Sequence, residues 1–92
     1  MLWRFFDGPI KAIITCYYAI PKSFSKGKKE KAMHNKILPC VKPDLDNVAK
    51  AILDSLNGLA YKDDSQIIEL NIKKVYSENP LVKVELYQVE EG

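Results

Sequence analysis

The sequence predicts an α+β fold in which a small mixed β-sheet carries helices packed on one face. Two segments with helical character separate an early β-branched stretch from two later stretches of alternating apolar residues. The order strand, helix, helix, strand, strand is typical of a two-layer α+β domain. With 92 residues, 47% of them hydrophobic, we expect one small domain spanning residues 1–92.

The first predicted strand covers residues 10–20. It is rich in β-branched and aromatic side chains and apolar on both faces, as expected of a central strand. Trp3, Phe5 and Phe6 precede it and look like packing residues. We expect these aromatic side chains to be partly exposed unless a partner or a further segment covers them.

A lysine-rich segment over residues 22–42 follows this strand. It holds seven lysines and one glutamate, a net charge of +6, whereas the rest of the chain holds seven cations and eleven acids, a net charge of −4. Within it we expect a short helix capped by Ser25. A solvated surface loop is one interpretation, and a surface that binds a polyanion is the other. The lysines are Lys22, Lys26, Lys28, Lys29, Lys31, Lys36 and Lys42.

The second predicted helix begins near Asp46 and stops at the Asn57-Gly58 pair, a common helix end. Its apolar residues recur at helical spacing and form one side of the helix. They are Val48, Ala49, Ile52, Leu53 and Leu56.

Two further strands are predicted over residues 66–76 and 81–89, separated by a turn at residues 77–80 that contains a proline. Both alternate between apolar and polar residues. Because they are consecutive and joined by a short turn, we expect them to pair as an antiparallel hairpin.

Four aspartates flank the second helix. Asp44 and Asp46 lie two residues apart at its start, and Asp63 and Asp64 follow its end. One aspartate at a helix start is explained by capping and by the helix dipole, and a domain whose aspartates only cap helices is one interpretation. Two aspartates exceed that need. If the chain returns to the helix start, these carboxylates could hold Mg²⁺, which prefers oxygen ligands.

Lys50 lies one helical turn after Asp46. It could form an ordinary ion pair with Asp46 or Asp54, worth a few tenths of a kcal/mol. Alternatively, its ammonium group could face the phosphate of a bound substrate.

The two cysteines, Cys16 and Cys40, fit neither a metal-binding spacing nor a disulfide framework. We therefore expect a reducing, cytoplasmic environment. No apolar run approaches the length of a membrane span, so we expect no membrane partner.

The motif K-P-D-L-D-N-x-x-K-A-x-L-D-x-L-N-G, followed by D-D-S-Q, resembles the RusA family of Holliday-junction resolvases from bacteria and their phages. The segment A-I-P-K-S-F-S-K at residues 19–26 is similar to phage-type members. The resemblance extends over roughly residues 8–89 and implies a RusA-like fold.

The resemblance also implies a function. The family consists of homodimeric, Mg²⁺-dependent endonucleases that cut four-way DNA junctions by paired nicks. Its catalytic aspartates match Asp44, Asp46 and Asp64, and its essential lysine matches Lys50. Asp63 matches the acidic neighbour of the third aspartate and is a further candidate metal ligand. The lysines of residues 22–42 would contact the DNA backbone.

Family members usually carry a further strand and helix before the segment that begins here at Gly8. We therefore expect an N-terminally truncated nuclease domain. A non-catalytic, DNA-binding remnant of the same fold is the alternative hypothesis.

Overall fold

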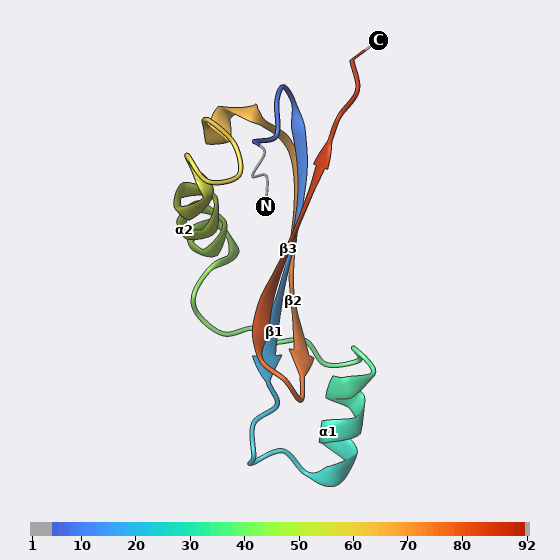
Figure 1. The fold of residues 1–92 in the computed structure, drawn as a ribbon. Coiled ribbons are helices and arrows are strands. Elements are labelled where there is room, and N and C mark those ends of the chain that lie inside the picture. Colours follow the sequence, from blue (N-terminus) through green and yellow to red (C-terminus); the bar gives the residue numbers. More distant parts are fainter. Residues whose placement is uncertain (1–4, 92) are drawn as a thin grey trace.

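The computed structural model describes residues 5–91 and confirms the predicted α+β class. The predicted helices and strands are all present within one or two residues of their expected bounds (Figure 1). In chain order the elements are β1 (Ile10–Ala19), α1 (Lys26–Met33), α2 (Leu45–Leu56), the short 3₁₀ helix η1 (Asp64–Gln66), β2 (Ile67–Ser77) and β3 (Leu81–Gln88).

The sheet has the strand order β2-β1-β3. β1 is parallel to β2 and antiparallel to β3, so that Ile14 lies between Ile72 and Val84. The predicted hairpin of the last two strands is therefore wrong, because β1 lies between them. The physical reason is that β1 is apolar on both faces, and its backbone groups are satisfied along both edges only when a strand pairs on each side.

Helix α2 covers one face of this sheet (Figure 1). Alternate residues of β1, namely Ala12, Ile14 and Cys16, are buried together with Leu53 of α2. Partly buried side chains from α2 and from the outer strands complete this core, among them Val48, Ile52, Ile72, Val84 and Leu86. The amphipathic pattern of α2 thus fixes the helix against the sheet.

A second cluster joins the chain that follows α2 to the start of β1. Ile10, Ala60 and Tyr61 are buried there, and Phe6 packs against them. Phe6 is half-buried and Phe5 is exposed, whereas Trp3 lies outside the described residues. This cluster holds the loop before η1 in place.

Gln66 connects three segments at the same end of the molecule. Its Nε2 donates hydrogen bonds to the carbonyl oxygens of Phe6 (3.1 Å) and Gly8 (2.9 Å). Its Oε1 accepts from the backbone N–H groups of Lys62 (3.0 Å) and Asp63 (3.2 Å). Gln66 therefore ends η1, and the strand that was predicted to include it begins one residue later.

Helix α1 lies beyond the ends of the strands, next to β2 (Figure 1). Ser25 caps it as predicted, because its hydroxyl accepts the backbone N–H of Lys28 at 3.2 Å. Ala32 is the single buried residue of this helix. Phe24 anchors it by packing edge-on against Tyr76, with ring centroids 5.7 Å apart. Within the described part of the chain, no helix is long and apolar enough to span a membrane.

Candidate functional site

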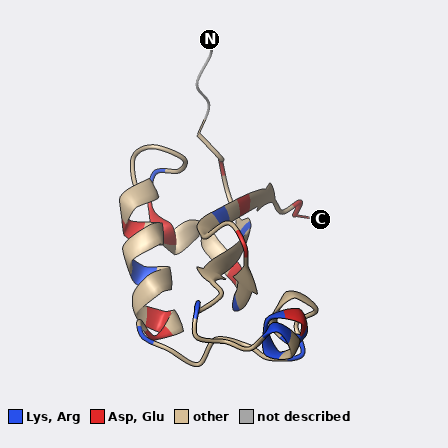
Figure 2. Cartoon of the chain, turned by 90° about the horizontal axis from the view of Figure 1, so that it is seen from below, with Lys and Arg blue, Asp and Glu red and all other residues tan. Residues whose placement is uncertain are grey.

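One exposed side of α2 carries Asp46, Lys50 and Asp54 at four-residue spacing. Side chains four residues apart lie one above the other on a helix, so these three form a stripe beside the apolar side that packs on the sheet. Figure 2 shows the resulting alternation of acidic, basic and acidic positions along α2. Because the core fixes α2, the backbone positions of this carboxylate–lysine stripe are fixed as well.

Asp44 occupies the N-cap position of α2, in extended backbone geometry. A capping carboxylate normally accepts a backbone N–H of the first turn, yet the Asp44 side chain forms no such hydrogen bond. Asp46 lies in the first turn, where its charge opposes the helix dipole. Helix capping therefore does not explain why Asp44 carries a carboxylate.

Asp63 caps η1. Its Oδ2 accepts the backbone N–H of Ser65 at 2.9 Å, and Gln66 completes a capping box. The Ser65 side chain, and after it this backbone N–H, lower the pKa of Asp63 by hydrogen bonding to its carboxylate. The carboxylate of Asp63 therefore has a structural partner already.

Asp64 lies next to Asp54 of α2. Desolvation raises the pKa of Asp64, and so do a hydrogen bond with Asp54 and the charges of Asp63 and Asp54. Two carboxylates in contact share a proton or a cation more readily than they ionise together. Asp54, which was not among the predicted site residues, is therefore part of this carboxylate group; its four-residue spacing from Lys50 was the available signal.

Tyr61 connects these carboxylates to the body of the protein. Its buried hydroxyl donates a hydrogen bond of 2.7 Å to the carbonyl oxygen of Leu53. Burial raises the pKa of Tyr61, and the nearby charges of Asp64, Asp54 and Asp63 raise it further. Tyr61 thus fixes the loop before η1 to α2. Sequence reasoning missed it, because nothing in its spacing marks a contact with α2.

The predicted carboxylates fall at two ends of α2. Asp44 and Asp46 lie at its start, whereas Asp64 lies beside Asp54, about 12 Å further along the axis at 1.5 Å per residue. Across residues 5–91, no three His, Cys, Asp or Glu side chains come close enough together to hold a metal ion. Carboxylate oxygens suit Mg²⁺ chemically, but the structure does not bring Asp44, Asp46 and Asp64 to one point. Their role as metal ligands stays a prediction.

Lys74 of β2 holds the segment that leads into α2. Its Nζ donates a hydrogen bond to the carbonyl oxygen of Val41 and lies 5.6 Å from the ring centre of Tyr18. Val41 comes three residues before Asp44 in the chain. Lys74 therefore fixes the approach to the helix start from the sheet, a role that a lysine in a strand does not reveal by sequence.

The seven predicted DNA-binding lysines are all exposed to solvent. Four lie in α1 and three lie in the flanking loops. Figure 2 shows the basic positions of α1 in blue. Lys28 also lies over the ring of Phe24, with Nζ 4.2 Å from its centre. The positive charge is thus concentrated around α1, away from η1 and its carboxylates.

These features define a class of protein: a small α+β domain with carboxylates on a fixed helix and a separate cluster of lysines. A family model described as "Endodeoxyribonuclease RusA" matches residues 1–87. The chain belongs to the RusA family, which confirms the resemblance seen in the sequence.

Two relatives are similar over most of this chain. One is the "Uncharacterized protein YqaN" of Bacillus subtilis (strain 168), 46% identical over 84 residues. The other is the "Crossover junction endodeoxyribonuclease rusA" of Lactococcus phage r1t, 37% identical over 82 residues. The matches cover 89% and 88% of this chain but only 59% and 56% of the relatives' own length. No solved structure matches the chain significantly.

Proposed function

We propose that this protein is a structure-selective endodeoxyribonuclease. It resolves Holliday junctions by Mg²⁺-dependent hydrolysis of phosphodiester bonds, acting in the cytoplasm in DNA recombination and repair. The observation that carries this proposal is the match of residues 1–87 to the RusA family. The name of the phage relative, a crossover junction endodeoxyribonuclease, supports the same substrate.

We assign the catalytic roles to Asp44, Asp46, Asp64 and Lys50. Asp44 and Asp46 are the first pair of candidate metal ligands, because they lie two residues apart and Asp44 makes no capping hydrogen bond. Asp64 and its neighbour Asp63 are the further candidates. When bound, Mg²⁺ would supply a polarised water and positive charge at the phosphate.

Lys50 lies midway along the stripe between Asp46 and Asp54. An ammonium group there would hold the scissile phosphate between the carboxylates and offset the negative charge that develops on its oxygens. Without that cation, the carboxylates of α2 would repel a phosphate group.

We propose branched DNA as the substrate and a homodimer as the active form. Paired nicks in opposite strands of a four-way junction require two sites, and one chain carries one set of these residues. The lysines of residues 22–42 would bind backbone phosphates and make binding dependent on salt.

The test is cleavage of a synthetic four-way junction beside a linear duplex of matched sequence, with Mg²⁺ or with EDTA. We expect symmetric nicks in the junction alone, and only with Mg²⁺. Asp46→Asn should lower cleavage at least about 100-fold, the scale expected when a group that stabilises the transition state is removed. Asp7→Asn, at an exposed aspartate outside the stripe, is the matched control. Unchanged cleavage in Asp46→Asn would contradict the assignment.

A second candidate function is DNA binding without cleavage. It is favoured by one observation, the separation of Asp64 from the start of α2. It predicts salt-dependent binding of the junction with no nicks in any divalent metal, so the same experiment decides between the two.

A further inference from the structure

A groove is lined by residues from the end of β1, from α1 and the loop before it, and from the turn that joins β2 to β3. Figure 1 shows α1 and this turn at the far end of the sheet from η1. The volume of the groove is about 360 Å³. A smaller hollow of about 210 Å³ adjoins it, since Met33 and Glu78 line both. The groove is lined by Ala19, Ile20, Lys22, Lys29, Met33 and Glu78, and the hollow adds Tyr76, Ser77 and Asn79.

The floor of this groove is apolar and accessible. Met33 is 49% exposed although it lies beside Ile20 in the groove lining. A thioether is polarisable and makes favourable contacts with aromatic rings. Tyr76 presents an aromatic ring in the adjoining hollow, where Phe24 packs against it edge-on. Ile20 and Met33 therefore offer apolar contacts to a ligand in the groove, and Tyr76 offers an aromatic side chain in the hollow next to it.

The rim of the groove is cationic. Lys29 lies one turn before Met33 on the same side of α1, and Lys22 faces the groove from the preceding loop. Two ammonium groups against the single carboxylate of Glu78 leave a net positive charge. The ligand that matches this surface is flat and apolar at one end and anionic at the other.

We propose that this groove binds one unpaired nucleotide of a DNA strand, with its base against Ile20 and Met33 and its phosphate at Lys22 and Lys29. A base stacked inside a duplex has no face to offer such a floor, whereas an unpaired base does. The inference rests on the proposed function in one respect, since base pairs at the crossover of a branched DNA open more readily than those inside a duplex, but it requires no hydrolysis.

Glu78 gives the groove a preference among bases. A carboxylate accepts a hydrogen bond from the exocyclic amino group of cytosine, and thymine has no such group. We therefore expect a cytosine to be bound more tightly than a thymine, and we expect this preference to depend on Glu78.

The experiment measures binding of the full chain to a short single strand in EDTA, so that cleavage plays no part. One central nucleotide is cytosine, thymine, the fluorescent base 2-aminopurine or an abasic residue. We expect the abasic strand to bind at least about five-fold more weakly than the cytosine strand, as removal of one stacked base predicts. The fluorescence of 2-aminopurine should change on binding.

Three variants locate the site. Met33→Ser should remove most of the difference between cytosine and abasic strands, whereas Leu59→Ser, at another exposed apolar residue, should keep it. Lys29→Ala should lower the slope of log affinity against log salt by about 0.7, the value for one neutralised phosphate on a single strand, and Lys62→Ala should leave it unchanged. Glu78→Ala should abolish the preference for cytosine over thymine.

Equal binding of cytosine and abasic strands by the unchanged protein would overturn the inference, and so would an absence of single-strand binding. Neither result would contradict the nuclease proposal, which is tested by cleavage of the junction with Mg²⁺. Conversely, an uncleaved junction together with a base-dependent single-strand affinity would leave the groove assigned and the nuclease proposal refuted.

Discussion

The two helices of this protein carry their charges in different ways. α2 buries Ala49 and Leu53 against the sheet and holds its carboxylates and Lys50 on a fixed backbone. α1 has no apolar side, buries only Ala32, and depends on Phe24 for its packing against β2. The difference follows from what each set of groups is proposed to do. Hydrolysis requires groups held in a defined geometry, whereas attraction of a DNA backbone requires only charge nearby.

The largest expected effect concerns how strongly each helix is held, α2 against the sheet and α1 against β2. Leu53→Ala removes a buried side chain from the main core and should lower the free energy of unfolding by about 3 kcal/mol. Phe24→Ala removes a half-buried ring and should cost about 1 kcal/mol. Denaturant unfolding of both variants measures the difference. Equal decreases would mean that α1 is as firmly attached as α2.

Removal of charge from α1 should affect DNA binding and leave stability unchanged. With Lys26 and Lys31 both changed to alanine, affinity for a four-way junction should fall about tenfold. The slope of log affinity against log salt should decrease by about 0.9 for each DNA phosphate that the variant no longer neutralises. The melting temperature should not fall, because both side chains are exposed. A lower melting temperature with unchanged affinity would mean that these lysines of α1 stabilise the fold and do not bind DNA.

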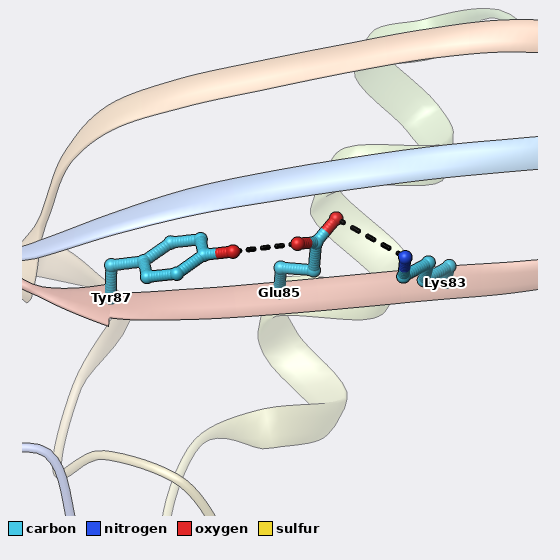
Figure 3. A network of polar contacts seen from close by, with 3 residues as sticks. All are labelled: Lys83, Glu85 and Tyr87. Carbon is cyan, nitrogen blue, oxygen red and sulfur yellow. Dashed lines mark hydrogen bonds and ion pairs between the residues drawn. The ribbon is translucent and has the colours of Figure 1, made fainter.

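The hydrogen bond between Tyr61 and α2 tests how the carboxylates at η1 are held. Tyr61→Phe removes the hydrogen bond to the Leu53 carbonyl and should lower the free energy of unfolding by about 1 kcal/mol. Tyr87→Phe is the matched control. Its hydroxyl donates to Glu85 at 2.6 Å in the exposed network with Lys83 that Figure 3 shows, so its removal should cost less. Equal costs would mean that burial does not strengthen the Tyr61 hydrogen bond.

The smallest expected effects concern Asp63 and Asp64, whose pKa values shift in opposite directions. The pKa of Asp64 is raised, so its contribution to stability is present below the ordinary value of 3.8 and is lost as pH rises through the raised value. The pKa of Asp63 is lowered, so its contribution is present above 3.8 and is lost as pH falls through the lowered value.

At pH 7, Asp64→Asn should therefore raise the melting temperature and Asp63→Asn should lower it, each by at most about 3 °C. Both differences from the unchanged protein should shrink as the pH falls. The difference for Asp64→Asn should shrink between the raised pKa of Asp64 and 3.8, and the difference for Asp63→Asn between 3.8 and the lowered pKa of Asp63. Thermal melts across this pH range measure the effect. Shifts of the same sign for the two variants would contradict the assigned hydrogen bonds.

Sequence reasoning predicted those features that depend on neighbouring residues. The strand at residues 10–20, the cap at Ser25 and the apolar side of α2 follow from local periodicity and hydrogen bonding, and all three are confirmed. The strand order was not predictable in this way. Alternation shows which residues of a strand face the core, but it does not identify the neighbouring strand.

The sequence predicted which residues belong to the candidate site, but it did not predict how they are arranged in space. Spacing allowed the chain to return from the end of α2 to its start, but Tyr61 and Gln66 hold η1 beside Asp54. Gln66 bonds to Phe6 and Gly8, which are far from it in the chain, and Tyr61 bonds to a backbone carbonyl oxygen, which no sequence pattern marks as a partner. The hydrogen bond of Lys74 to Val41 was missed for the same reason.

The central position of β1 has a consequence for how the chain folds. Ile10 pairs with Ile67 on one side and with Gln88 on the other, so both pairings span more than half of the chain. Closing such long loops before any sheet pairing forms is slow, and we expect folding slower than that of helical proteins of equal size. During synthesis, β1 leaves the ribosome before either of its neighbours and gains the second one only when β3 is complete. Until then, an apolar strand with an open edge is exposed to aggregation.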